Sequence, residues 1–137
     1  MRTYLYLFLS LLLFSCQIDP EDENTRIEKI AAFDIQMPDN MNVNFEYTIS
    51  FSYALPNGCY SFFGFDIESD DITEKNVRLI YAFAEVANDE ICSLEYSEEV
   101  YSFRFTPDES KTYLFRFWIG QNDEGIDQYE EIELIVV

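Results

Sequence analysis

Apolar and polar residues alternate with a period of two over much of this chain. The clearest run has apolar side chains at every odd position from Val43 to Tyr53, with polar side chains between them. Such a period places successive side chains on opposite faces of a β-strand, whereas an amphipathic helix repeats about every 3.6 residues. The pattern therefore predicts strands with one buried and one solvated face.

Six short turn segments rich in Pro, Asn, Asp and Gly separate the alternating stretches. These residue types favour turns for distinct steric and hydrogen-bonding reasons. No long amphipathic helix pattern occurs, so the apolar face of each sheet must pack against another sheet. The predicted fold class is all-β, an antiparallel β-sandwich with seven strands at residues 27–36, 42–54, 59–67, 76–87, 96–106, 111–120 and 127–137.

The segment Ser110–Phe115 resembles the penultimate strand of immunoglobulin-like domains. In those domains a tyrosine near the strand start hydrogen-bonds back across the preceding corner, and Tyr113 occupies the matching position. The resemblance covers about residues 27–137 and implies an immunoglobulin-like sandwich whose third and sixth strands are neighbours. The dipeptide Asn57-Gly58 also favours a tight hairpin, which would keep the second and third strands in one sheet.

The N-terminus has the features of a secretory signal. Arg2 precedes an apolar run from Tyr4 to Phe14, which is about half the length that a bilayer-spanning helix needs. Cys16 follows directly after the small residue Ser15, as in a lipoprotein cleavage box. We expect residues 1–15 to be cleaved and Cys16 to carry the lipid, because two or more acyl chains make a stable anchor. The alternatives are an uncleaved anchor helix and a buried strand.

An acidic stretch interrupted by Pro20 follows, and we interpret residues 16–26 as a flexible tether and residues 27–137 as the sandwich domain. This arrangement resembles small lipoproteins of the Bacteroidota type, in which acidic residues after the lipidated cysteine direct export to the outer face of the outer membrane. The resemblance rests on Cys16, Asp19, Glu21, Asp22 and Glu23. It implies a lipid-anchored outer-membrane protein on the cell surface, with a periplasm-facing attachment as the alternative.

The cysteine count agrees with lipidation. The chain has three cysteines, so lipid on Cys16 leaves Cys59 and Cys92 as an even pair in an oxidising compartment. We expect a disulfide between them, closing a loop of about 34 residues. Two buried free thiols are the alternative.

The formal net charge of −19 repels nucleic-acid phosphates and anionic head groups. Basic residues are scattered, as Arg104, Lys111 and Arg116 illustrate, so no nucleic-acid partner is expected. The many regularly spaced Phe and Tyr residues oppose disorder and imply a folded core. The charge is best explained by solubility and by repulsion between neighbours on a crowded membrane.

The sequence contains no histidine, which excludes Ser-His-Asp and Cys-His catalysis and removes the commonest zinc ligand. It also lacks a Gly-rich phosphate loop. A two-carboxylate glycosidase is compatible with the residue types, but it needs a deep cleft that one small sandwich seldom provides. We expect a non-catalytic protein without a cofactor.

Two acidic clusters are candidate calcium sites, because loops between strands can deliver several of the six to eight oxygens that calcium binds. Their alternative is ordinary solvated loop charge. The candidates are Asp66, Glu68, Asp70 and Asp71 in the first cluster, and Asn122, Asp123, Glu124 and Asp127 in the second.

A candidate binding patch follows from the phase of the third and sixth predicted strands. If their odd positions face the core, Tyr60, Phe62 and Trp118 point outward, and Leu114 and Arg116 share that outward phase. An exposed aromatic patch would stack on sugar rings or hold a protein partner. The alternative is that another part of the chain covers these side chains.

Three functions fit these features. The first is a non-catalytic, membrane-anchored lipoprotein that binds a protein partner or acts as an accessory subunit. The second is a carbohydrate-binding module for glycan capture. The third is an inhibitor or immunity-type protein of the envelope, with the loop Pro56-Asn57-Gly58 and the disulfide forming a rigid edge.

Overall fold

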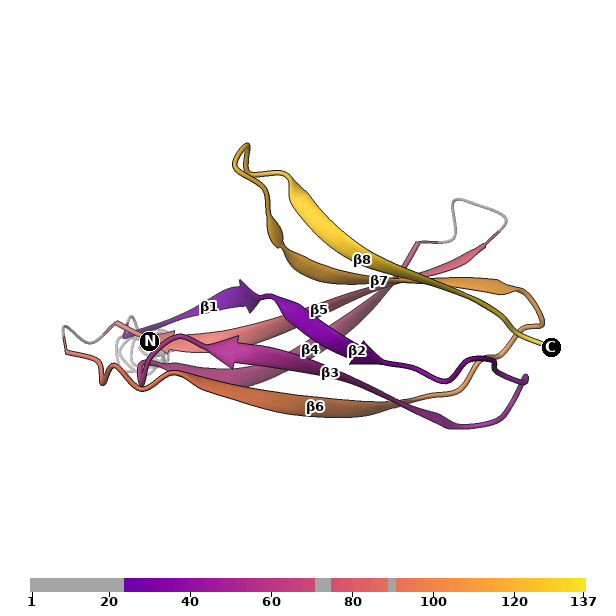
Figure 1. The fold of residues 1–137 in the computed structure, drawn as a ribbon, viewed down its shortest axis with the longest axis horizontal. Coiled ribbons are helices and arrows are strands. Elements are labelled where there is room, and N and C mark those ends of the chain that lie inside the picture. Colours follow the sequence, from indigo (N-terminus) through magenta and orange to yellow (C-terminus); the bar gives the residue numbers. More distant parts are fainter. Residues whose placement is uncertain (1–23, 71–74, 89–90) are drawn as a thin grey trace, which may run out of the picture.

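The computed structural model describes residues 24–70, 75–88 and 91–137, and the predicted signal peptide and most of the predicted tether lie outside these ranges. The described part of the chain forms eight strands and no helix, and Figure 1 shows their arrangement. Within it, no helix is long and apolar enough to cross a membrane. The strands are β1 (Thr25–Ile30), β2 (Ala32–Gln36), β3 (Tyr47–Leu55), β4 (Tyr60–Asp70), β5 (Asn76–Ala87), β6 (Ser97–Phe105), β7 (Thr112–Gln121) and β8 (Asp127–Ile135).

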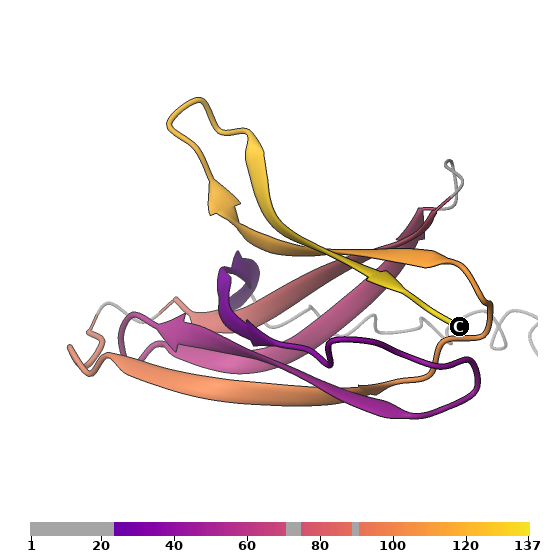
Figure 2. The same ribbon diagram turned by 45° about the vertical axis from the view of Figure 1, so that its right-hand side comes forward.

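The strands form two sheets. Sheet A contains five of them, in the order β1-β5-β7-β8 with β4 on β5, and sheet B contains β2, β3 and β6. The two sheets form the layers seen in Figures 1 and 2. The predicted all-β sandwich is confirmed, because apolar side chains of both sheets meet in one buried cluster.

The first predicted strand is divided between the two sheets. The strand is interrupted at Ala31, so that β1 pairs with β5 in sheet A and β2 pairs with β3 in sheet B. The strand also starts earlier than predicted, since Thr25 already pairs with Ala87. The two halves thereby join the layers at one side of the sandwich.

Strand β5 organises sheet A. Along one edge it pairs antiparallel with β4. Its other edge is shared, because residues 76–80 pair in parallel with β7 and residues 82–87 pair antiparallel with β1. The strand order therefore differs from the immunoglobulin-like expectation, since β5 separates the third predicted strand from the sixth. A long, largely apolar strand is suited to this central position, where one face is buried in the core and the other is partly buried.

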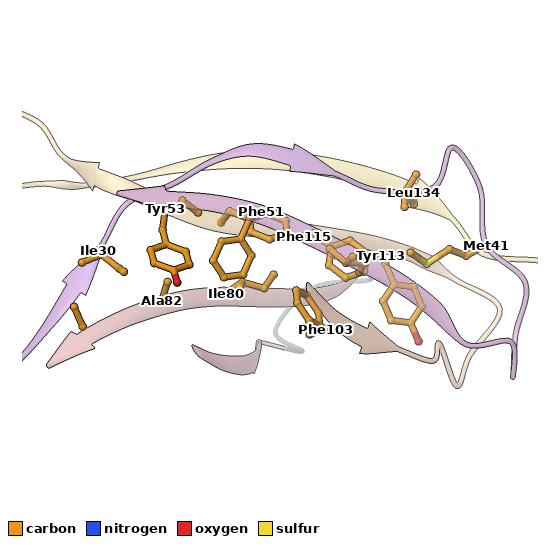
Figure 3. Close-up of a cluster of buried hydrophobic side chains, with 14 of the residues drawn as sticks. Ile30, Met41, Phe51, Tyr53, Ile80, Ala82, Phe103, Tyr113, Phe115 and Leu134 are labelled. Carbon is orange, nitrogen blue, oxygen red and sulfur yellow. The ribbon is translucent and has the colours of Figure 1, made fainter. Parts of the chain in front are cut away.

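The core lies between the sheets and is largely aromatic. Figure 3 shows Phe51 and Tyr53 of β3 pointing toward Ile80 and Ala82 of β5. Phe51 lies with its ring centroid 6.2 Å from that of Phe117, so β3 and β7 also meet there. The completely or almost completely buried large side chains are Met41, Ile49, Phe51, Ile80, Tyr113, Phe115, Phe117 and Val136.

Tyr113 forms the predicted corner contact. Its hydroxyl donates a hydrogen bond of 2.7 Å to Asp108 Oδ1 and accepts bonds of 3.3 Å from the backbone N–H groups of Asp108 and Glu109. The side chain is fully buried. This expectation from the immunoglobulin-like resemblance is confirmed, although the strand order departs from it.

The second predicted strand begins too early. Residues 42–46 form a turn in which the Phe45 N–H bonds to the Asn42 carbonyl at 3.3 Å and Asn44 has a φ of 64°. Phe45 is 64% exposed, so it does not extend the buried face of β3. An alternating pattern continues here without a strand, because the backbone of this segment bonds instead to Pro107 and Val137.

Candidate functional site

A β-bulge in β4 decides where Tyr60 and Phe62 lie. Phe62 pairs with Ala84 and Gly64 pairs with Phe83, so Phe63 is an extra residue in the ladder. One extra residue reverses the face of every side chain beyond it. The odd positions after the bulge, Phe65 and Ile67, pack on the core as predicted, but before the bulge the even positions do so.

The outward placement of Tyr60 and Phe62 is therefore wrong. Both pack against the core, and the Phe62 ring stacks at 4.5 Å on Tyr53 and lies 4.9 Å from Tyr101. The single phase assumed for this strand ignored the bulge. The residue that the bulge exposes is Phe63, which is 62% exposed.

The other three residues of the predicted patch lie on the outer face of sheet A. In β7, Tyr113, Phe115 and Phe117 are buried in the core, and the intervening side chains point away from it. Neighbouring strands add aromatic side chains to the same face through the pairs Trp118–Tyr129 and Asp66–Tyr81. We call this surface the aromatic face, and it comprises Lys29, Tyr81, Leu114, Arg116, Trp118 and Tyr129.

Ring and hydroxyl contacts connect the aromatic face. The hydroxyl oxygens of Tyr81 and Tyr129 lie 3.1 Å apart, and their rings meet edge to face at 6.3 Å. The Arg116 guanidinium lies 4.5 Å from the Tyr129 ring centroid and donates a 2.8 Å hydrogen bond to Glu131. Burial, followed by the hydrogen bond with Tyr129, raises the pKa of Tyr81, so its hydroxyl stays protonated at physiological pH.

Trp118 is the least accessible member of this face. It is only 8% exposed, and Lys29 Nζ lies 4.9 Å from its ring. Its indole nitrogen is buried without a hydrogen bond of normal geometry, yet its N–H helps to lower the pKa of the Asp127 carboxyl to about 2. Asp127 also accepts bonds from Lys29 and Gln121. Trp118 thus contributes little of its ring to the surface.

The outer face of sheet B is different in composition. The buried residues of β3 are Ile49, Phe51, Tyr53 and Leu55, so Ser50 and Ser52 point outward. The outward positions that pair with these serines are Ser102 and Val100 on β6 and, opposite Ser52, Phe33 on β2. Phe33 is thus the single aromatic side chain among these outward positions, whereas several aromatic side chains contact one another on the outside of sheet A. The two outer faces are therefore chemically distinct.

Tyr60 lies at a second location, the end of the sandwich where β1 begins. Three shallow pockets of about 340, 330 and 410 Å³ meet there, and each has Tyr60 in its wall. The Tyr60 hydroxyl donates a 3.1 Å bond to Glu28, which is paired with Arg26 at 2.5 Å. Burial, then the bond to Glu28, raises the pKa of Tyr60. The predicted patch is therefore divided between two separate surfaces.

The calcium candidates are not assembled into a site in the described residues, where no group of three or more acidic, Cys or His side chains could hold a metal ion. The side-chain oxygen Oδ1 of Asn122 accepts bonds from the backbone N–H groups of Glu124 and Ile126 in its own turn. Both carboxylate oxygens of Asp127 are engaged by Lys29 and Gln121. Asp71 lies outside the described residues.

The disulfide between Cys59 and Cys92 is present, with Cα atoms 5.3 Å apart, which confirms that prediction. It attaches the segment after β5 to the start of β4. The adjoining Gly58 N–H bonds to the Ser93 carbonyl at 2.9 Å. The loop Pro56-Asn57-Gly58 thus does lie against the disulfide.

Sequence reasoning missed Tyr81, Tyr129 and Lys29 as members of the aromatic face. The alternation of β5 and β8 carried the signal, since Tyr81 and Tyr129 occupy the phase opposite to Ile80 and Ile132. Lys29 could not be placed in this way, because its position depends on the pairing of β1 with the middle of sheet A.

Comparison with known proteins gives no match to this chain among protein-family models, curated proteins or solved structures.

Proposed function

We propose that this chain is a non-catalytic, lipid-anchored binding module of a bacterial cell envelope, and that its ligand is a protein held by the aromatic face. Cys16 carries the lipid in this proposal, and no cofactor takes part. The outer membrane is the proposed location, with the domain on the cell surface. The sequence likeness to Bacteroidota-type lipoproteins supports this placement.

The observation that carries the binding role is the contrast between the two outer faces. The sandwich already has a complete core between its sheets, so the aromatic and aliphatic side chains on the outside of sheet A are not needed to close it. Tyr and Arg are also enriched where proteins bind one another. A partner covering this face would bury Tyr81, Leu114 and Tyr129, which remain half-exposed in the isolated chain.

The burial of Trp118 favours a protein over a glycan as the ligand. Sugar rings stack on open aromatic faces, but Lys29 lies across this indole. The Tyr81 and Tyr129 rings meet edge to face, and the nearby Phe83 ring is tilted by 38° from that of Tyr81, so these rings do not form a flat platform. The carbohydrate-binding role is the second candidate, and a glycan array tests it directly.

One observation favours the inhibitor or immunity-type role. The Gly58 N–H bonds to the Ser93 carbonyl beside the disulfide of Cys92, which gives a rigid edge. Its distinguishing feature would be a hydrolase as the captured partner. Crosslinking from Asn57 on that edge, compared with crosslinking from the aromatic face, separates the two roles.

The main test replaces Tyr129 with a photo-crosslinking amino acid in the full-length protein. The protein is expressed in intact bacterial cells, so that the cell envelope is present. Ser52, on the outer face of sheet B, is the matched control position. The purified partner is then titrated against wild type, Leu114→Glu and Ser52→Glu. We expect crosslinks from position 129 alone, and at least about a tenfold weaker affinity for Leu114→Glu. Equal crosslinking at both positions, or equal affinities of the two variants, would contradict the proposal.

Anchoring is tested separately. Mass analysis of the N-terminal peptide measures lipid on Cys16, and protease treatment of intact cells distinguishes surface display from a periplasm-facing attachment. An unmodified Cys16 would remove the lipoprotein assignment while leaving the binding face open to test.

A further inference from the structure

We propose that the loop after β5 inserts apolar side chains into the surface of the membrane that holds the anchor, so that the domain is oriented on the bilayer as well as tethered to it. The proposal concerns Ile91, Leu94 and Tyr96, which we call the membrane loop. It rests on the proposed lipid anchor at Cys16. The ligand is the headgroup region of a weakly charged bilayer.

The membrane loop is the most exposed apolar segment of the described chain. Ile91 is 92% exposed, Leu94 is 96% exposed and Tyr96 is 60% exposed. These three residues lie within six consecutive positions, whereas Phe45 and Phe63 are exposed singly. Two aliphatic side chains with a nearby tyrosine suit a bilayer interface, where apolar groups enter the acyl boundary and the phenol stays among the head groups.

The loop is also held in place. The disulfide fixes Cys92 to Cys59, and the Gly58 N–H bonds to the Ser93 carbonyl at 2.9 Å. Gly58 and Ser93 are so close that a Cβ atom at position 58 would lie 2.1 Å from Ser93 Oγ. The disulfide at Cys92 and the hydrogen bond at Ser93 lie between Ile91 and Leu94. They therefore keep these two side chains away from the core.

The chain toward the proposed anchor leaves the domain beside this loop. The Asn88 N–H bonds to the Asn24 carbonyl at 2.7 Å, and Arg26 donates a 2.7 Å bond to the Asn88 side chain. Figure 1 shows the start of β1 and the orange segment after residue 90 at the same end of the long axis, with the C-terminus at the other end.

The length of the intervening chain limits the distance to the membrane. Cys16 precedes Asn24 by eight residues, which span at most about 26 Å when extended. A lipid on Cys16 therefore keeps this end of the domain near the bilayer, while Phe45 lies at the opposite end, in the turn that bonds to Pro107 and Val137. The membrane loop is thus the exposed apolar segment closest to the anchor.

Charge determines the kind of surface. Glu95 lies within the loop and Glu98 follows it, and the chain carries a strong negative charge overall. Anionic lipids would repel this end, and salt would reduce that repulsion. A surface of phosphatidylethanolamine and phosphatidylcholine fits both the apolar side chains and the acidic surroundings.

Tryptophan fluorescence tests the insertion in the full-length, lipidated protein. The chain has one tryptophan, the buried Trp118, so Leu94→Trp adds an exposed reporter in the loop. Phe45→Trp is the matched control at the opposite end. The vesicles contain phosphatidylethanolamine and phosphatidylcholine with brominated acyl chains. We expect at least about twofold stronger quenching for Leu94→Trp than for Phe45→Trp, together with a blue shift.

Two measurements separate failure of this inference from failure of the anchor. Lipid on Cys16 is measured by mass on the same samples, and flotation with the vesicles is recorded for wild type. If the protein is lipidated and floats, equal quenching at positions 94 and 45 overturns the inference. The inference is also overturned if the blue shift of Leu94→Trp occurs only when a purified protein partner is added and not when vesicles are added. The loop would then contact a protein. Replacing a third of the lipid by phosphatidylglycerol should decrease the quenching at position 94.

Discussion

Lys29 on β1 and Asp127 on β8 join two strands that are not hydrogen-bonded neighbours in sheet A, with Nζ 3.1 Å from Oδ2 across 98 residues of sequence. The same ammonium lies over Trp118 and 5.2 Å from the Tyr81 ring. Figure 2 shows the β7–β8 hairpin bending away from the two layers. This ion pair therefore connects the turn end of the hairpin to β1.

The first prediction concerns acid. The N–H groups of Trp118, Gln121 and Lys29, in that order, lower the pKa of the Asp127 carboxyl from 3.8 to about 2. A pKa lowered by folding stabilises the native state above about pH 4, and that contribution is lost as the pH falls toward 2. As the pH falls from about 4 to 2, the free energy of unfolding should therefore decrease less in Asp127→Asn than in wild type. Urea unfolding at pH 6 and pH 2.5 measures it, and parallel losses in both proteins would contradict the prediction.

The second prediction concerns the corner. Tyr113→Phe removes one donated and two accepted hydrogen bonds from a buried hydroxyl and leaves their partners at the turn unsatisfied. We expect a loss of about 1–3 kcal/mol in the free energy of unfolding. The control Tyr96→Phe removes an exposed hydroxyl and should change stability by less than about 0.5 kcal/mol. Urea denaturation compares them, and equal effects would argue against a structural corner.

The third prediction uses the close approach of Gly58 and Ser93. Gly58→Ala places a methyl group against Ser93 Oγ and should cost about 1 kcal/mol. Ser93→Ala removes that oxygen, after which the nearest side-chain atom is the Ser93 Cβ at 3.2 Å. The double variant should recover much of the loss. Additive effects in a double-mutant cycle would show that the contact does not limit this loop.

The fourth prediction concerns the disulfide. The bridge between Cys59 and Cys92 spans 33 residues, for which the chain-entropy account gives about 3.5–4 kcal/mol. The double variant with alanine at both positions should lose that much, and a reducing agent should then have no further effect. Wild type, denatured without reduction, should show neither of these thiols as free. Two reactive thiols would contradict the assignment.

The predicted strands agree best with the structure where pairing follows local sequence. The strand predicted at 76–87 has the observed bounds, because its apolar run is continuous and turn residues flank it. Strand β4 shows the limit of this reasoning. The buried side chains Phe62 and Phe65 are three residues apart, and only the pairing with β5 shows that a bulge accounts for the spacing.

Three of the five residues of the predicted patch, Leu114, Arg116 and Trp118, lie on the outside of sheet A, although Trp118 is only 8% exposed. The error at Tyr60 and Phe62 came from the bulge, which the alternating pattern alone did not reveal. The neighbours of Trp118 could not be predicted, since β5 uses one edge for both β7 and β1. That arrangement depends on contacts between distant segments, and the period of hydrophobicity reports only local structure.

The position of β1 also determines how the domain would respond to mechanical load. Strand β1 is the first element of the described chain, and it lies antiparallel to β5 along the whole run from Thr25 to Ile30. If the proposed anchor and partner both hold the domain, a pull from the membrane would act along this strand and strain its backbone hydrogen bonds together. Bonds sheared together resist far more force than bonds opened one at a time, so the strand nearest the proposed anchor is arranged to bear tension.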